Sequence, residues 1–96
     1  MPTIRAGDFE WDAAKAAINV RKHGIAFEEA MTVFLDELAV PFQDVVHSER
    51  LVLVGHSSIG RILLVIFTER MPGGILRIIS ARRASKRERR AYEEEQ

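Results

Sequence analysis

The feature that most constrains the fold is a series of short β-prone segments in the second half of the chain. Residues 51–54, 62–67 and 75–81 are rich in Val, Ile and Leu, which favour pleated strands. The turn sequences between them, residues 57–60 and 71–74, are short, so we expect an antiparallel meander. The middle segment is apolar on both faces, which is typical of a central strand that needs cover on both sides of its sheet.

Helices are expected ahead of this sheet. After a short β-prone segment at residues 9–11, Asp12 fits an N-cap because its carboxylate can accept an unpaired backbone N–H. The alanine-rich stretch that follows should end at Gly24, a natural left-handed C-cap. Residues 27–34 carry an apolar stripe and fit a second helix. The two helices should form a hairpin that covers one sheet face.

The last elements complete an α+β protein. Residues 38–42 fit a weak strand at the sheet edge, because a proline interrupts the segment. Ser85 and Glu88 form a capping box at the start of a helix that runs to about residue 94. This helix or a partner chain should cover the second sheet face. The expected order is β-α-α-β-β-β-β-α, an antiparallel sheet packed by helices in a single domain over residues 1–96.

Charge is distributed unevenly along the chain. The net charge is zero, yet residues 1–49 carry 4 basic and 9 acidic side chains, net −5, and residues 50–96 carry 10 and 5, net +5. Between Arg77 and Arg90 there are seven basic residues and one acidic residue, a local charge of 7 − 1 = +6. Two explanations are open: the two halves pair with each other, or the basic segment binds a polyanion such as RNA.

Composition excludes several classes of protein. The chain has no cysteine, which rules out a disulfide framework and any cysteine-based zinc site or nucleophile. Its three histidines lack the spacing of a metal site. No signal peptide is visible at the start, and the longest apolar run, six residues, is far short of a membrane span. We therefore expect a cytoplasmic protein with no cofactor, no metal and no membrane contact.

Several short motifs, in their order and spacing, resemble the BrnT family of type II toxins. In the first half these motifs are Phe9-Glu10-Trp11-Asp12, Lys15, Asn19, Lys22-His23-Gly24-Ile25 and Phe27. In the second half they are Gly55, Gly60-Arg61, residues 65–68, Arg77-Ile78-Ile79-Ser80-Ala81-Arg82 and the tail at residues 85–93. The resemblance covers roughly residues 9–93.

The resemblance implies a RelE-like fold and a metal-independent endoribonuclease that cleaves RNA and inhibits translation. It also implies a BrnA-type antitoxin with a ribbon-helix-helix DNA-binding domain. Toxin and antitoxin would form a heterotetramer that represses its own operon, so that operator DNA is contacted only through the antitoxin. Two other functions are open: a non-enzymatic RNA- or protein-binding module, and a degenerate toxin retained as antitoxin co-repressor.

Metal-free RNA cleavage uses the 2′-hydroxyl of the substrate as nucleophile. The enzyme must remove a proton from this hydroxyl, stabilise the pentavalent phosphorane and protonate the leaving 5′-oxygen. Arginine suits the second task, because its planar fork binds two phosphate oxygens, and histidine suits the other two. Our hypothesis is that His56, Arg61 and Arg82 converge near one sheet edge as catalytic residues. The alternative for His56 is a solvated position beside a turn.

Further candidates each have a structural alternative. Lys22 is a candidate catalytic group and His23 an RNA contact, or both interact with the C-terminal end of the first helix. Arg77 interrupts an apolar strand, where it could anchor a phosphate or form an ion pair with Glu10 or Asp12.

The basic segment and the last helix provide the remaining candidates. Arg83 and Arg87 could bind RNA or form part of a solvated helix face. Tyr92 could stack on a base or pack on the sheet. His47, in a polar loop, is expected to have no role at the site.

Overall fold

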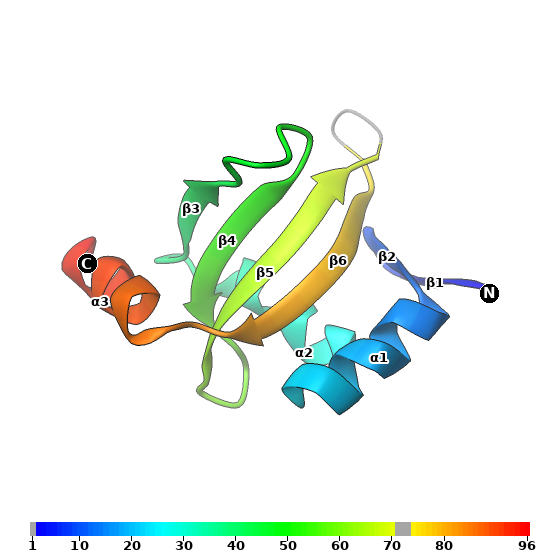
Figure 1. The fold of residues 1–96 in the computed structure, drawn as a ribbon, viewed down its shortest axis with the longest axis horizontal. Helices are drawn as coiled ribbons and strands as arrows, with labels where there is room; N and C mark the ends of the chain where they lie inside the picture. The colour runs from blue at the N-terminus through cyan, green and yellow to red at the C-terminus, as the bar shows by residue number, and fades with distance from the viewer. Residues whose placement is uncertain (1, 71–73) are drawn as a thin grey trace.

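The computed structural model describes residues 2–70 and 74–96, and these form one mixed sheet with helices on it (Figure 1). The strands are β1 (Thr3–Ala6), β2 (Phe9–Asp12), β3 (Val40–Gln43), β4 (Leu51–His56), β5 (Ile62–Glu69) and β6 (Leu76–Arg83). The helices are α1 (Ala13–His23), α2 (Phe27–Thr32), the short 3₁₀ turn η1 (Val33–Leu35) and α3 (Lys86–Glu94). The α+β class is confirmed. Of the expected turn at residues 71–74, all but Gly74 lies outside the described residues.

The strands follow the spatial order β1-β2-β6-β5-β4-β3. The antiparallel meander from β3 to β6 is confirmed, with the proline-containing β3 at the edge. The expectation of a wholly antiparallel sheet is wrong at the other side, because β2 pairs parallel with β6, with Phe9 opposite Leu76 and Glu10 opposite Arg77. Strand β1 was not expected. It forms a hairpin with β2 around Gly7, whose φ of 61° suits glycine.

The helix boundaries follow local hydrogen bonding, as the sequence predicts. Asp12 Oδ1 accepts the backbone N–H groups of Ala14 at 2.8 Å and Lys15 at 3.1 Å, which caps α1. Gly24 ends α1 in the left-handed conformation with φ of 72°. The capping box of Ser85 and Glu88 begins α3. The second helix is shorter than expected and continues as η1.

Helices α1 and α2 lie together on one side, whereas α3 lies apart from them beside β3 and β4 (Figure 1). The larger core lies between the sheet and the first two helices, and its buried residues are Trp11, Ile25, Phe27, Ala30, Val33, Leu63, Val65, Phe67, Ile78 and Ala81. A smaller core on the opposite face contains Val52, Val54, Leu64 and Tyr92. Helix α3 therefore covers part of the second sheet face, beside β3 and β4, where Tyr92 packs, while Ile62 and Ile66 on the same face are only partly buried.

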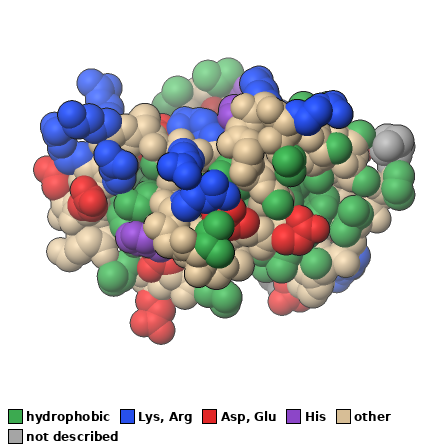
Figure 2. Space-filling model, turned by 90° about the horizontal axis from the view of Figure 1, so that it is seen from below, with side chains coloured by type: hydrophobic (Ala, Val, Ile, Leu, Met, Phe, Trp, Pro, Cys, Tyr) green, Lys and Arg blue, Asp and Glu red, His purple; other side chains and the backbone are tan. Residues whose placement is uncertain are grey.

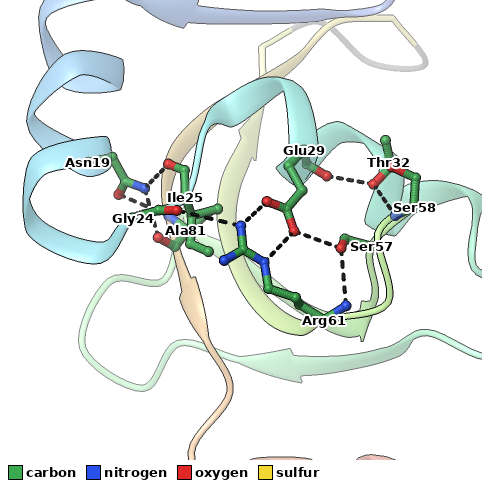
Figure 3. Close-up of polar contacts among 9 residues, drawn as sticks. All are labelled: Asn19, Gly24, Ile25, Glu29, Thr32, Ser57, Ser58, Arg61 and Ala81. Carbon is green, nitrogen blue, oxygen red and sulfur yellow. Dashed lines mark hydrogen bonds and ion pairs between the residues drawn. The ribbon is translucent and has the colours of Figure 1, made fainter.

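The edge of β6 beyond its short pairing with β2 is occupied by a side chain of α1. The Nδ2 group of Asn19 donates to the carbonyl oxygens of Ala81 and Ile25, both at 2.8 Å. Its Oδ1 atom accepts the Ala81 N–H at 3.2 Å. Asn19 is 5% exposed, so it satisfies both backbone groups of Ala81 as a neighbouring strand would (Figure 3).

Within the described residues, no helix is long and apolar enough to cross a membrane.

Candidate active site

A cavity of about 230 Å³ lies where the β4–β5 turn meets the start of α3. Its lining residues are His56, Gly60, Arg61, Ile62, Arg83, Ala84 and Arg89. In the view from this end, basic side chains gather over α3 and continue toward the centre of the surface (Figure 2). The cavity is thus lined by one histidine and three arginines, residue types that can bind a phosphate group and transfer protons.

The turn before β5 places His56 and Arg61. The Ser57 N–H donates to the Arg61 carbonyl at 2.8 Å, and the Gly60 N–H donates to the Ser57 carbonyl at 3.0 Å. Gly60 has a φ of 85°, so this is a three-residue turn with glycine in the left-handed position. His56 therefore lies opposite Ile62 rather than Arg61. A tight turn over residues 57–60 would have placed His56 opposite Arg61, but both residues line the cavity in the observed register as well.

Arg61 is held by a carboxylate of α2. Its Nε atom donates to Glu29 Oε2 at 3.0 Å, and its Nη2 atom donates to Glu29 Oε1. Ser57 Oγ donates to the same Oε2 at 2.7 Å (Figure 3). The hydrogen bonds from Arg61 lower the pKa of Glu29 despite partial burial of its carboxylate. Glu29 in turn raises the pKa of Arg61. Among the described residues, Arg61 Nη1 has no hydrogen-bond partner, so it is the part of the guanidinium left for a ligand.

A bulge in the β5–β6 pair determines which arginine reaches the cavity. Phe67 lies opposite Ile78, but the next pair is Ile66 with Ser80, so Ile79 has no partner on β5. The extra residue shifts the register of β6 by one position from this point onward. Because side chains alternate between faces, such a shift moves every later side chain to the other face.

Arg82 consequently lies on the α3 face of the sheet, as His56 does, and on the opposite face from Arg61, which binds Glu29 of α2. It lies opposite Leu64, which belongs to the smaller core beside α3, while Arg83 lies opposite Leu63 of the larger core. Without the bulge, Leu63 would face Arg82. The hypothesis that Arg82 converges with His56 and Arg61 is therefore wrong, and Arg83 lines the cavity in its place.

Arg82 is bound instead by the first turn of α3. Its Nη1 and Nη2 atoms donate to Glu88 Oε1 at 2.8 Å and Oε2 at 2.9 Å. Together with the N-cap contacts of Ser85, this lowers the pKa of Glu88 to about 2, even though the carboxylate is partly buried. The bidentate pair joins β6 to α3 and so contributes to the stability of the fold.

His56 is exposed, but one of its ring nitrogens contacts a buried tyrosine. His56 Nδ1 lies 3.0 Å from the Tyr92 hydroxyl, which donates to Asp36 Oδ2 at 2.6 Å. Tyr92 is 3% exposed. Its ring is therefore not available to stack on a base, and the alternative that it packs on the sheet is confirmed. Burial and the hydrogen bond to Asp36 raise the pKa of Tyr92 to about 12.

Lys22 and His23 line a different hollow, of about 160 Å³, beside α1 and the middle of β6. Both lie in the last turn of α1, where a positive charge is favourable beside the helix end. Neither lines the cavity that contains His56 and Arg61. The structure therefore separates Lys22 from the other candidate catalytic residues.

Arg77 forms an ion pair with Glu10, its neighbour across the parallel β2–β6 pair. This confirms the alternative to a phosphate anchor. Arg70 also approaches Glu10, at 3.7 Å, and Arg61 pairs with Glu29. The explanation that the two halves of the chain pair is thus confirmed for these arginines. Among the described residues, Arg83, Lys86, Arg87, Arg89 and Arg90 have no ion-pair partner.

Sequence reasoning missed three residues that organise the site. Glu29 lies within residues 27–34, where the sequence indicates only a helix, and Asp36 lies in the connection that follows them. Arg89 lay in the basic segment but was not distinguished from its neighbours. The available signal for Arg89 was its position four residues after Ser85, one helical turn past the N-cap and so on the same side of α3. The two acids gave no local signal, because their partners lie far away in the sequence.

Comparison with known proteins identifies relatives of this chain. The family described as "Ribonuclease toxin, BrnT, of type II toxin-antitoxin system" matches residues 11–88. The crystal structure of the Brucella abortus ribonuclease toxin BrnT is similar, with 32% sequence identity and a TM-score of 0.66. That match covers 79% of this chain and 94% of the Brucella chain. The comparison with curated proteins gave no match.

Proposed function

Because the chain belongs to the BrnT family of ribonuclease toxins of type II toxin–antitoxin systems, we propose that its cavity cleaves RNA without a metal ion. The observation that carries the proposal is the convergence of His56 with Arg61, Arg83 and Arg89 around one cavity. These side chains match the needs of a reaction in which a 2′-oxygen attacks the adjacent phosphorus.

His56 supplies the acid–base group in this proposal. As the bond between the 2′-oxygen and phosphorus forms, the hydroxyl proton passes to the imidazole. The bond between phosphorus and the 5′-oxygen then breaks, and the 5′-oxygen takes a proton from solvent. The products are a 2′,3′-cyclic phosphate and a 5′-hydroxyl. General acid–base assistance of this kind contributes about 10²–10⁴-fold in rate.

The arginines stabilise the phosphorane. Arg61 presents its Nη1 edge while Glu29 fixes the other side of the guanidinium. Arg83 and Arg89, both exposed, add positive charge around the same cavity. Because Glu29 already orients the Arg61 guanidinium, this group can stabilise developing negative charge without reorganisation.

The outer face of α3 provides the sequence-independent affinity for RNA. Lys86, Arg87 and Arg90 are exposed there, close to Arg83 and Arg89 of the cavity. Phosphates that flank the cleaved bond would pair with these side chains, so binding should weaken as salt is added.

Membership of a type II toxin–antitoxin family supports an antitoxin as the partner in the cell. Our proposal is that a BrnA-type antitoxin with a ribbon-helix-helix domain neutralises this toxin in a heterotetramer. The complex would repress its own operon through contacts of the antitoxin with operator DNA. Released toxin would cleave RNA in the cytoplasm and thereby inhibit translation.

A purified-protein assay tests the activity. The wild-type chain and its His56→Ala and Arg61→Ala variants are incubated in EDTA with RNA, with and without ribosomes, and the new RNA ends are analysed. We expect cleavage by the wild type, with cyclic phosphate and 5′-hydroxyl ends, and severe loss in both variants. Intact RNA that is nevertheless bound in a salt-dependent manner would contradict the proposal and favour a binding module. Cleavage that requires added Mg²⁺ would contradict metal independence.

A further inference from the structure

The imidazole of His56 is connected to the carboxylate of Asp36 through the hydroxyl group of Tyr92. The hydroxyl lies 2.6 Å from Asp36 Oδ2 and 3.0 Å from His56 Nδ1. The three residues come from different elements: the segment after η1, the end of β4, and α3. The residues are far apart in sequence, and the sheet with α3 brings them into one chain of hydrogen bonds.

The direction of these hydrogen bonds follows from counting protons. Asp36 is surrounded by donors, because Oδ2 accepts the His56 backbone N–H at 2.8 Å and Oδ1 accepts the Leu38 N–H at 2.9 Å. Partial burial opposes ionisation of Asp36, but these donors and the Tyr92 hydroxyl outweigh it and lower its pKa. An ionised carboxylate can only accept, so the single hydroxyl proton of Tyr92 points to Asp36.

The tyrosine oxygen is then left with acceptor capacity only. His56 Nδ1, 3.0 Å away, must therefore carry a proton to complete the chain. A neutral imidazole holds one proton, so Nε2 is the nitrogen with a free lone pair. This is the form of histidine that can remove a proton from a substrate hydroxyl.

Packing keeps this arrangement in place. The Tyr92 ring is buried in the smaller core and meets the His56 ring edge to face, with centroids 5.5 Å apart. Asp36 packs against Gly55, where an added Cβ would lie 2.9 Å from Asp36 Oδ2. Glycine next to His56 therefore leaves the space that the carboxylate occupies.

We propose that Asp36 and Tyr92 are positioning residues for the ribonuclease reaction: they hold His56 with its proton on Nδ1 and its Nε2 available to the substrate. This inference rests on the proposed function of His56 as the acid–base group. When Nε2 takes the proton of the 2′-hydroxyl, the imidazolium keeps its Nδ1–H bond to Tyr92. The negative charge of Asp36 then stabilises it through the tyrosine.

The test begins with the tautomer of His56 in the wild-type chain, read from long-range ¹H–¹⁵N correlation spectra of the neutral ring. We expect the Nδ1–H form. In Tyr92→Phe, which keeps the ring and its packing, both tautomers should be populated. The value of kcat for RNA cleavage should fall roughly 10- to 100-fold while KM stays unchanged. Glu93→Gln, at the next and exposed position of α3, serves as the matched control.

The outcomes separate this inference from the proposed function. A wild-type His56 with its proton on Nε2, or a tautomer that Tyr92→Phe leaves unchanged, would overturn the inference without any reference to activity. An Nδ1–H tautomer in a chain whose cleavage survives His56→Ala would overturn the proposed function, and with it the catalytic meaning of the hydrogen-bond chain. A merely structural tyrosine would not alter the tautomer.

Discussion

Leu63 lies opposite Arg83, not opposite Arg82, in the antiparallel pair of β5 and β6. Leu63 is fully buried in the core below α1 and α2. Arg83 therefore shares a face with that core and reaches the cavity, whereas Arg82 turns to α3 and pairs with Glu88. Two adjacent arginines thus have different roles in this account, one at the site and one in the fold.

Alanine substitutions should separate these roles. Arg83→Ala should lower the rate of RNA cleavage roughly 10²-fold, because it removes a cation from the phosphate site, with an unchanged melting temperature. Arg82→Ala should lower the free energy of unfolding by about 0.5–1 kcal/mol, since the pair is partly exposed, and leave cleavage by the folded protein intact. Thermal unfolding and initial cleavage rates measure both effects. The reverse pattern would show that the bulge does not determine the site.

The pairing of Glu29 with Arg61 leads to a second prediction. Glu29→Gln removes the charge that holds the guanidinium but keeps the size of the side chain. Arg61 should then adopt several orientations, and the cleavage rate should fall roughly 10- to 100-fold. Glu28→Gln, at the neighbouring exposed position, should have no effect. Circular dichroism establishes that both variants fold, and equal rates for the two variants would refute the orienting role of Glu29.

Acid should destabilise the protein through specific carboxylates. The pKa of Glu88 is lowered to about 2 in the folded state, and the pKa values of Glu29 and Asp36 are also lowered. A carboxylate whose pKa is lower in the folded state than in the unfolded state stabilises the protein at pH values above its unfolded-state pKa. This stability is lost as the pH falls toward its folded-state pKa. The free energy of unfolding should therefore decrease from about pH 5 to about pH 2.

Glu88→Gln isolates one contribution to this pH dependence. Urea unfolding of the wild type and the variant across that range should give a smaller decrease for the variant, because its side chain no longer titrates. Parallel curves would mean that the Arg82–Glu88 pair has no part in acid unfolding.

Local chemistry explains which parts of the fold were predictable. The caps at Asp12 and Gly24 and the capping box at Ser85 involve neighbours in sequence, so residue types alone indicate them. The parallel pairing of β2 with β6 joins segments more than 60 residues apart. The unpaired Ile79 likewise has no distinctive sequence signal. The parallel pairing and the bulge both depend on how the helices pack against the strands, and no local sequence pattern predicts that packing.

In the candidate site, too, only the residues that are close in sequence could be predicted to lie together. His56 and Arg61 flank a turn that the sequence marks with Gly60, so their proximity could be inferred. Glu29 and Asp36 come to the site from the helical region, and their partners lie 32 and 56 positions later in the chain. A single register shift at the bulge exchanged Arg82 for Arg83, because the side-chain period of a strand is two.

Asn19 should be the most sensitive polar position in the fold. In Asn19→Asp the donating amide becomes an oxygen that faces the carbonyls of Ala81 and Ile25, which now lack a donor. The free energy of unfolding should fall by about 2–4 kcal/mol, the cost of leaving buried polar groups unsatisfied. Val20→Ala, at a position that is 47% exposed, should change it little. Urea unfolding measures both, and an Asn19→Asp variant as stable as the wild type would contradict the strand-replacing role of Asn19.

The most direct test of the central claim is a growth experiment with RNA-end mapping. The wild type, Arg61→Ala and the surface variant Arg21→Ala are induced in bacteria that lack the antitoxin. We expect growth arrest and new RNA 5′-hydroxyl ends for the wild type and Arg21→Ala, and neither for a folded Arg61→Ala. Arrest with the same new ends in Arg61→Ala, or a wild type that leaves cellular RNA intact, would contradict the proposed ribonuclease site.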